Sequence, residues 1–563
     1  MAVVLLGPAS AWAGVGNAVV KPVAACASLA SVDLSDIAGQ GSRISSASDT
    51  LSNGIAVCTV QGTLAPSIGF TVLLPTQTWT QRYLQVGCGG LCGRISLEVG
   101  AAEGCTPLTH GEFAMAATNM GHQDGDETFG DDAQKRADFA HRAVHLTAVA
   151  AKKLIQQFYG QPQQYAYFTG CSDGGREALM EAQRYPQDFN GIIAGAAALN
   201  FQVQNGLYHP WQVRANQGPD GKAILLAARL PLLHQAVLKQ CDALDGQTDQ
   251  LLTDPRACHF DPKVLLCADG QAAAGCFSTA EVAAAQRLYD GPRDSKTGAR
   301  LTVGGPQPGS ELAWAGVFVP ASAEQPVMSQ MIALQALRGV LFEHNPASSF
   351  SLADLTFTTS TFERLRTLHP LYDATNPDLS AFEAAGGKLI LWHGWADPHI
   401  SPLNTIAYHQ ALQTQMGESR SQGFERLYLL PGVYHCSGGE GPSQLDLLTP
   451  MLAWVEAGQA PQAITTTQAS ADQQHARGFG APVGVKGPPP GQGKPPMGPP
   501  PVFDTANQGR TRPVYPYPLV AVYDGHGDPK QASSYRPERS PVAESNVQWL
   551  GADFFTPYAP SQR

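Results

Sequence analysis

One stretch, residues 165–177 (YAYFTGCSDGGRE), constrains the fold of this chain more than any other. Residues 165–169 are rich in aromatic and β-branched side chains and predict a buried strand, whereas residues 176–184 have a helical composition. The glycines between them predict a sharp turn around Ser172. A G-x-S-x-G pattern between a strand and a helix is typical of a turn that presents a nucleophilic serine above a sheet. The alternative is a serine whose hydroxyl only caps the helix.

Two loops further along the chain contain an acid and a histidine that could activate this serine. The apolar run 388–393 predicts a strand and is followed by Asp397, and the run 426–430 predicts another strand and is followed by His435. In α/β-hydrolases the acid and the histidine follow the serine in this order, each in a loop after a strand. Ser172, Asp397 and His435 are therefore the candidate catalytic triad. Taken singly, Asp397 could be a helix cap and His435 a surface residue.

A glycine-rich loop, residues 87–93 (GCGGLCG), directly follows the predicted strand 82–86. In chains with a nucleophilic serine turn, this position supplies one backbone N–H of the oxyanion hole, and the residue after the serine supplies the other. The prediction therefore places the two donors at Gly89 and Asp173. A flexible glycine turn without a catalytic part is the alternative interpretation.

The remaining pattern predicts an α/β fold. Strand-like runs at 113–118 and 191–195 alternate with a long amphipathic helix at 135–158, which is typical of a parallel sheet covered on both faces. Short helices with few strand signals follow, which indicates an insertion. We expect an α/β-hydrolase fold with a catalytic domain formed by residues 14–200 and 376–563, a large inserted lid domain at 201–375, and a Pro/Gly-rich loop at 480–511.

One segment of the expected lid has the composition of a calcium site. Three carboxylates within eight residues supply the hard oxygen ligands that Ca²⁺ prefers, and two backbone carbonyls could complete the shell. The candidate ligands are Asp242, Asp245 and Asp249 with the carbonyls of Gln247 and Leu251. Cys241 and Cys258 flank the segment and could close it as a loop. A solvated acidic turn is the alternative, and the spacing is not that of an EF-hand.

Charge and cysteine content limit the partners and the compartment. The formal net charge of −11, without a Lys/Arg cluster, argues against a nucleic-acid partner. No apolar run reaches the length of a membrane span. Residues 1–13 are apolar and end in an A-x-A pattern, which predicts the remnant of a signal peptide although a basic start is missing. Together with eleven cysteines, this pattern favours a secreted or periplasmic protein.

These motifs resemble those of a known enzyme family. Gly170-Cys-Ser-x-Gly-Gly-Arg, Asp397 in a D-x-x-I-S-P context, and His435 followed by cysteine are similar to motifs of the tannase and feruloyl esterase family, which includes the mono(2-hydroxyethyl) terephthalate hydrolases. The resemblance extends from about residue 26 to residue 535. In this family a cysteine before the nucleophile is bonded to a cysteine after the catalytic histidine, and Cys171 and Cys436 occupy these places.

The resemblance implies further disulfides and a metal. It implies the bridges Cys171–Cys436, Cys26–Cys58, Cys241–Cys258 and Cys267–Cys276, and it places a structural calcium ion on the five candidate ligands, with no catalytic cofactor. The chain departs from the family at Tyr515, which replaces a cysteine, so one family bridge is absent. Cys88, Cys92 and Cys105 have no assigned partner, and the odd total leaves at least one thiol free or paired between chains.

The family resemblance also implies a function. We expect a serine esterase that hydrolyses esters of aromatic acids such as ferulate, gallate or a terephthalate half-ester through an acyl-enzyme. An acyltransferase or peptidase on the same triad and a catalytically silent exported binding protein are the alternatives. Several lid aromatics could stack on the substrate, although most aromatics in such a segment belong to the core: Trp211, Trp314, Phe318 and Phe342. No oligomeric state is predicted.

Overall fold

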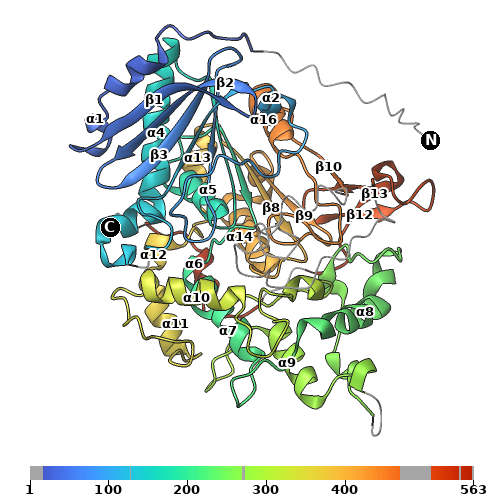
Figure 1. The fold of residues 1–563 in the computed structure, drawn as a ribbon. Helices are drawn as coiled ribbons and strands as arrows, with labels where there is room; N and C mark the ends of the chain where they lie inside the picture. Colours follow the sequence, from blue (N-terminus) through green and yellow to red (C-terminus); the bar gives the residue numbers. More distant parts are fainter. Residues whose placement is uncertain (1–16, 127, 269–272, 469–508, 544–546, 561–563) are drawn as a thin grey trace, which may run out of the picture.

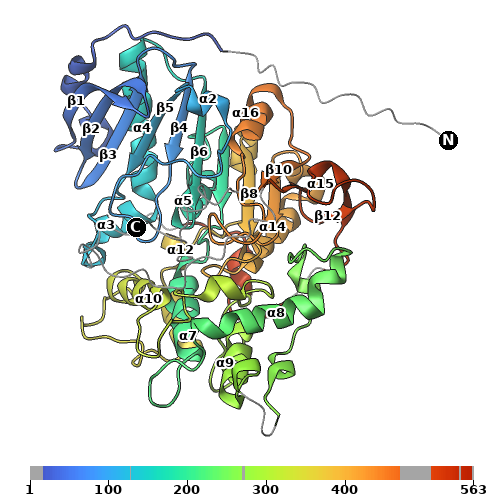
Figure 2. The same ribbon diagram turned by 45° about the vertical axis from the view of Figure 1, so that its right-hand side comes forward.

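The computed structural model describes residues 17–126, 128–268, 273–468, 509–543 and 547–560. A large sheet with helices on both faces forms one part of the molecule, and a mainly helical region packs against one end of that sheet (Figures 1 and 2). The predicted signal-peptide remnant and nearly all of the Pro/Gly-rich loop lie outside the described residues.

The central sheet has nine strands in the order β1-β2-β3-β5-β4-β6-β7-β8-β9. Neighbouring strands from β1 through β3 to β5 are antiparallel, and the pairs from β5 to β9 are all parallel. The strands are β1 Arg43–Ser52, β2 Ile55–Leu64, β3 Ile68–Pro75, β4 Arg82–Val86, β5 Phe113–Thr118, β6 Tyr165–Cys171, β7 Gly191–Gly195, β8 Lys388–Gly394 and β9 Glu425–Leu430. Two further antiparallel pairs follow: β10 Ile464–Thr467 with β11 Thr511–Val514, and β12 Leu519–Tyr523 with β13 Tyr535–Arg539.

The helices fall into two groups by their place in the chain. Those associated with the sheet region are α1 Ser35–Ala38, α2 Thr106–Thr109, α3 Ala133–Ala137, α4 Ala143–Tyr159, α5 Asp173–Arg184, α13 Ser380–Ala384, α14 Pro402–Met416, α15 Glu418–Ser421 and α16 Leu448–Ala457. Those between β7 and α13 are α6 Phe201–Val203, α7 His209–Ala215, α8 Leu230–Cys241, α9 Thr279–Asp290, α10 Met328–Gly339, α11 Thr359–Arg366 and α12 His369–Tyr372. The single helix predicted at 135–158 is interrupted by a π-helical turn at Asp138–Arg142.

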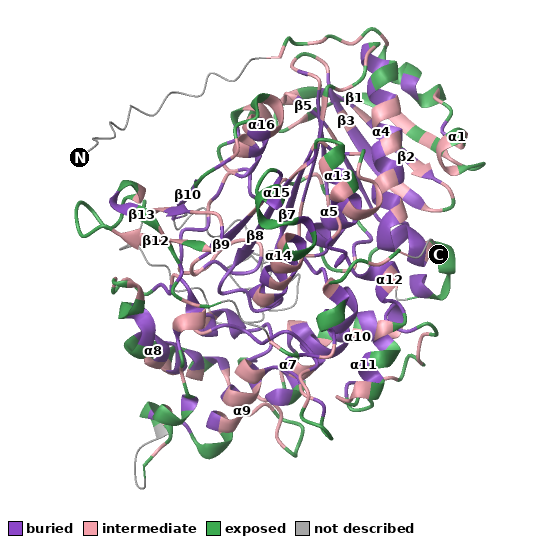
Figure 3. Ribbon diagram, turned by 180° about the vertical axis from the view of Figure 1, so that it is seen from behind, coloured by how far each residue is buried: buried purple, intermediate pink, exposed green. Residues whose placement is uncertain are grey.

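The parallel strands are apolar on both sides because both faces of the sheet are covered. Successive side chains of a strand point to opposite faces. In β8, Leu389 and Leu391 belong to the core that includes residues of α4, α5 and α14, whereas Ile390 and Trp392 belong to the core beneath α16. The purple strands in Figure 3 show this burial from behind. The continuous hydrophobic runs that predicted these strands are therefore a consequence of two-sided packing.

The region inserted between β7 and α13 has a hydrophobic core of its own. Trp314 and Phe318 are buried in this core, and Trp211 packs at its edge and donates its indole N–H to the carbonyl of Arg287. Phe342 is buried against the core of the sheet region. These four aromatics pack within the protein, which agrees with their interpretation as core residues.

One buried ion pair network ties the sheet to the helix that covers it. Arg82, at the start of β4, is 5% exposed and contacts Glu112 over 2.6 Å and Glu456 of α16 over 2.7 Å. Removing the Arg82 cation would leave two partly buried carboxylates without a counter-charge. This costs more stability than replacing all three charged groups together.

We therefore expect Arg82→Met to lower the free energy of unfolding by about 3–5 kcal/mol. Urea unfolding followed by tryptophan fluorescence measures this change, with Arg43→Met on the exposed edge strand β1 as the matched control. A midpoint for Arg82→Met equal to that of the control would show that the network contributes no net stability.

Candidate active site

The turn around Ser172 has the geometry of a strand-to-helix elbow. Ser172 lies between β6 and α5 with φ 64° and ψ −121°, a conformation that residues other than glycine rarely adopt. A Cβ added at Gly170 would lie 2.3 Å from the carbonyl oxygen of Gly174, so the flanking glycine is needed for this close approach. The Ser172 side chain makes no capping hydrogen bond to α5. The cap interpretation is therefore wrong, and the hydroxyl is left for other partners.

Asp397 and His435 meet directly. Nδ1 of His435 donates to Oδ2 of Asp397 over 2.6 Å, and Nε2 of His393 donates to the same oxygen over 3.0 Å. The other carboxylate oxygen accepts the backbone N–H groups of His399 and Ile400. Burial alone would raise the pKa of Asp397, but the charge of His435 and the hydrogen bonds from His393 and His435 hold this pKa well below its usual range. The ionised carboxylate therefore orients the His435 imidazole.

A disulfide joins the serine turn to the histidine loop. Cys171 and Cys436 are 265 positions apart in the sequence, and their Cα atoms lie 5.9 Å apart. Ser172 and His435, the residues next to these cysteines, therefore flank one covalent link. The hydrogen bonds of the described residues do not include one between the Ser172 hydroxyl and His435. In unliganded hydrolases this bond is often long and shortens when the substrate binds.

The two predicted oxyanion donors lie at the ends of adjacent strands. Asp173 is the first residue of α5, so its N–H has no acceptor within the helix. Gly89 lies exposed in the loop that leaves β4, the neighbour of β6 in the sheet. Among the described residues, no backbone or side-chain group accepts the Gly89 N–H. Both donors are therefore available at the edge where Ser172 lies.

The first helical segment of the inserted region supports the loop that carries the acid. This segment comprises α6, the π-helical turn Gln204–Tyr208 and α7. Gln204 donates to the carbonyl of His399, and Gln212 donates to the carbonyl of Pro398 over 2.7 Å. The ring centroids of His399 and His435 are 5.0 Å apart. The inserted region thus contacts the site and helps to fix the position of the acid loop.

Sequence reasoning missed residues that hold the site together. His393 is the next-to-last residue of β8, four positions before Asp397, and its imidazole also contacts the hydroxyl of Thr405 over 2.7 Å. Arg176 binds the Asp173 carboxylate with two nitrogens and is fully buried. A histidine at the end of an apolar strand was a visible signal, but its partner could be named only from the fold.

The cysteines pair as follows in the described part of the chain. Cys26–Cys58, Cys241–Cys258 and Cys267–Cys276 are bonded, as the family resemblance implied. Cys88 is bonded to Cys92 within the glycine-rich loop, and Cys105 is a free, buried thiol. The sequence had left the last three cysteines open.

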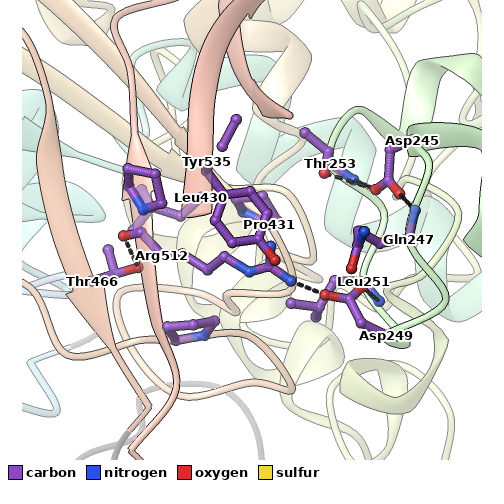
Figure 4. A pocket seen from close by; sticks show the side chains of 13 residues that line it. Asp245, Gln247, Asp249, Leu251, Thr253, Leu430, Pro431, Thr466, Arg512 and Tyr535 are labelled. Carbon is purple, nitrogen blue, oxygen red and sulfur yellow. Dashed lines mark hydrogen bonds and ion pairs between the residues drawn. The ribbon is translucent and has the colours of Figure 1, made fainter. Parts of the chain in front are cut away.

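The candidate calcium ligands gather beside a cavity between the inserted region and the sheet edge. Asp245, Gln247, Asp249 and Leu251 line this cavity opposite Arg512 of β11 (Figure 4). Asp242 does not line it and instead accepts the backbone N–H groups of Asp249 and Gln250. Four of the five predicted ligand residues therefore line one cavity, and Asp242 binds the backbone of the same loop.

The chemistry of this cavity suits a divalent cation. Burial raises the pKa of Asp249 to about 6, and the neighbouring carboxylates of Asp245 and Asp242 act in the same direction. The positive charge of Arg510 opposes this rise. Such crowding of negative charge is relieved when a cation binds. Arg512 donates to the Asp249 carboxylate in this cavity, so a bound cation would share that carboxylate with a guanidinium. The oxygen-only donor set is the kind that Ca²⁺ prefers.

Comparison with known proteins gives the family. The protein-family model described as tannase and feruloyl esterase matches residues 52–537 of this chain. An uncharacterized esterase of Xanthomonas campestris is 32% identical over 571 residues, covering 91% of this chain and 91% of its own length. The mono(2-hydroxyethyl) terephthalate hydrolase of Piscinibacter sakaiensis is 30% identical and covers 84% of this chain and 83% of that protein. Feruloyl esterase B of Aspergillus oryzae superposes with a TM-score of 0.74 at 22% identity, covering 91% of this chain and 100% of that one.

The sheet, its covering helices and the inserted region are an α/β-hydrolase fold with a lid, as the sequence predicted, and the chain is a carboxylic ester hydrolase. It belongs to the tannase and feruloyl esterase family. None of the described helices is both long and apolar enough to cross a membrane.

The contact between His393 and Asp397 generates a prediction about turnover. We expect His393→Leu to lower kcat for p-nitrophenyl acetate by about tenfold or more, because Asp397 loses a donor and His435 is held less firmly. His393→Gln keeps a side-chain N–H and should lose less. Steady-state kinetics with both variants test this order, and equal kcat values for the wild type and His393→Leu would contradict it.

Proposed function

We propose that this protein is an exported serine esterase that hydrolyses esters of aromatic carboxylic acids. The observation that carries the proposal is the hydrogen-bonded pair of Asp397 and His435, which the Cys171–Cys436 bridge fastens beside the strained turn at Ser172. Strain of this kind persists only where the surroundings enforce it, and it clusters at functional sites.

The reaction proceeds through an acyl-enzyme. The Ser172 hydroxyl attacks the ester carbonyl while His435 takes the hydroxyl proton, and Asp397 stabilises the imidazolium that forms. The N–H groups of Asp173 and Gly89 bind the oxyanion. His435 then returns the proton to the leaving alcohol. A water molecule, activated by the same imidazole, attacks the acyl-enzyme and releases the acid.

The substrate class rests on the relatives. The family model carries the description tannase and feruloyl esterase, and one relative is named as a hydrolase of mono(2-hydroxyethyl) terephthalate. The acids of these esters share a carboxyl group attached to, or conjugated with, an aromatic ring. We therefore assign this chain an ester of ferulate, gallate or a terephthalate half-ester. The lid aromatics Trp211, Trp314, Phe318 and Phe342 pack within the protein, so none of them identifies the ring-binding surface.

The two alternatives make different predictions. An acyltransferase on the same triad would gain rate when an alcohol acceptor is added, whereas a hydrolase would not. A silent binding protein would retain the fold without a competent nucleophile. The presence of Ser172, Asp397 and His435 in the chain favours the hydrolase over the silent protein.

Export of the protein is supported by its disulfides. The described residues contain five bridges, two of which, Cys171–Cys436 and Cys88–Cys92, involve loops of the candidate active site. Bridges of this number are typical of secreted or periplasmic proteins and rare in the cytosol.

We also propose a structural calcium ion in the lid. Asp242, Asp245, Asp249 and the carbonyls of Gln247 and Leu251 would hold it, and Asp242 also orders the loop through the N–H groups of Asp249 and Gln250. The ion would neutralise the crowded carboxylates and fasten the loop, which the Cys241–Cys258 bridge already closes. It lies in a structural cavity and takes no part in the ester chemistry.

The nucleophile assignment is tested with methyl ferulate, methyl gallate and mono(2-hydroxyethyl) terephthalate. We expect at least one of these esters to be hydrolysed, and we expect Ser172→Ala to lower kcat/KM for it by about 10⁴-fold or more. Ser31→Ala, at an exposed serine in the N-terminal region, is the matched control. Retention of most of the activity in a folded Ser172→Ala protein would eliminate the mechanism.

The calcium proposal is tested by thermal unfolding. Because calcium binds the folded loop only, we expect EDTA to lower the unfolding temperature of the purified protein by about 5 °C, and added CaCl₂ to restore it. Asp245→Asn should abolish this response, whereas Asp261→Asn, at an exposed lid carboxylate, should keep it. An unfolding temperature that EDTA leaves unchanged, in a sample shown by elemental analysis to lose its metal, would overturn the assignment.

A further inference from the structure

The loop that carries the second oxyanion donor is held at its ends and exposed at its tip. Gly89 and Gly90 are both exposed, and adjacent glycines have the greatest backbone freedom of any pair of residues. The N–H of Cys92 bonds to the carbonyl of Gly89 over 3.1 Å, and Gly90 and Cys92 have φ values of 64° and 63°. The Cys88–Cys92 bridge closes this turn covalently.

The base of the same loop lies directly on the elbow helix. A Cβ added at Gly87 would come within 2.7 Å of the Cα of Gly174, and one added at Gly174 would come within 2.7 Å of the carbonyl oxygen of Cys88. The loop and the first turn of α5 are therefore in backbone contact. A shift of one relative to the other would change the distance between the N–H groups of Gly89 and Asp173.

A buried glutamate on α5 occupies the junction. Glu177 is 1% exposed, and its Oε2 accepts the N–H of Cys88 over 3.4 Å, which is long for such a bond. Its Oε1 lies 2.7 Å from Sγ of Cys88 and 3.4 Å from Sγ of Cys92. The Asp173 carboxylate, bound by Arg176, also approaches the bridge, with Oδ2 at 3.4 Å from Sγ of Cys92.

The charge state of Glu177 agrees with this position. Burial, and then the nearby Asp173 carboxylate, raise the pKa of Glu177 well above its usual value. This shift favours the neutral form of the Glu177 carboxyl group. A neutral group can pack against the two sulfur atoms without the desolvation cost of a buried anion.

We propose that Glu177 and the Cys88–Cys92 bridge act together as positioning elements of the oxyanion hole, holding the Gly89 N–H at a fixed distance from the Asp173 N–H. Neither group touches the reacting atoms. Glu177 fixes the start of the loop on the elbow helix, and the bridge removes the freedom of the two exposed glycines. This inference rests on the proposed esterase function and adds to it the residues that preorganise one donor.

The inference predicts a loss of transition-state binding with little loss of substrate binding. Misplacing a donor by about 1 Å can cost up to about a hundredfold in rate. We expect the double variant Cys88→Ser/Cys92→Ser and the single variant Glu177→Leu each to lower kcat about tenfold or more, with KM within about twofold of the wild type. Glu177→Gln keeps the acceptor for Cys88 without a charge, so it should stay within about threefold of wild-type kcat.

The measurement is steady-state hydrolysis of the best aromatic ester, together with inhibition by an aryl trifluoromethyl ketone and by the product acid. The ketone adds the Ser172 oxygen and forms a tetrahedral oxyanion, whereas the product acid forms no such adduct, so the inhibition constant should rise about tenfold or more for the ketone and less for the acid. Cys26→Ser/Cys58→Ser, which opens a bridge to strand β2 outside the loops of the candidate active site, is the control. Urea unfolding verifies that each variant is folded, and Glu177→Leu provides the test if the double serine variant does not fold.

The outcomes separate this inference from the function on which it rests. A wild-type protein that hydrolyses none of the esters and does not react with a fluorophosphonate would overturn the proposed function itself. An active wild type whose folded variants keep its kcat and its affinity for the ketone would overturn only the positioning role. Equal losses of kcat in Glu177→Gln and Glu177→Leu would also contradict it, because the acceptor would then be irrelevant.

Discussion

The site depends on holding a strained turn in place. Ser172 adopts positive φ between β6 and α5, and this conformation costs about 1–3 kcal/mol that surrounding contacts must offset. Three contacts hold the turn. Gly170 packs on Gly174, and the N–H of Ser172 donates a hydrogen bond to the carbonyl of Gly195 over 3.0 Å. Cys171 forms a disulfide with Cys436. Because the same disulfide fixes His435, the restraint on the proposed nucleophile is also the restraint on its proposed base.

The inserted lid also helps to hold the loop that carries Asp397 in place. Its first helical segment donates hydrogen bonds to the carbonyls of Pro398 and His399, the two residues that directly follow Asp397. Motion of the lid would therefore reach the loop that carries Asp397. The buried His209 of the same segment has its pKa lowered to about 4 by burial, so it stays neutral beside His435 and adds no competing charge.

Local sequence patterns predicted the parts of this molecule that depend on local structure. The elbow was predictable because glycine spacing reports close backbone approach, and the parallel strands were predictable because two-sided burial leaves continuous apolar runs. The helix expected at 135–158 was found with a π-helical turn, which single-chain periodicity does not distinguish from a regular helix. The order of serine, acid and histidine, together with the family resemblance, identified the candidate triad.

The remaining features depend on contacts between distant segments. His393 matters because the fold turns its ring toward Asp397, and Glu177 matters because α5 lies beneath a loop that is 89 positions earlier in the chain. The pairing of Cys88 with Cys92, and the free Cys105, could not be read from spacing when three cysteines were equally open. Asp242 belongs to the same acidic segment, and its hydrogen bonds to the N–H groups of Asp249 and Gln250 could be identified only from the folded loop.

The central claim is that one serine is activated by one histidine across the Cys171–Cys436 link. The most direct measurement is peptide mapping by mass spectrometry after reaction with a fluorophosphonate, in the wild type and in His435→Ala. We predict a single phosphonylated site at Ser172 in the wild type and no detectable adduct in the variant within the same reaction time. Modification of a different serine, or equally fast modification of Ser172 without His435, would contradict the account.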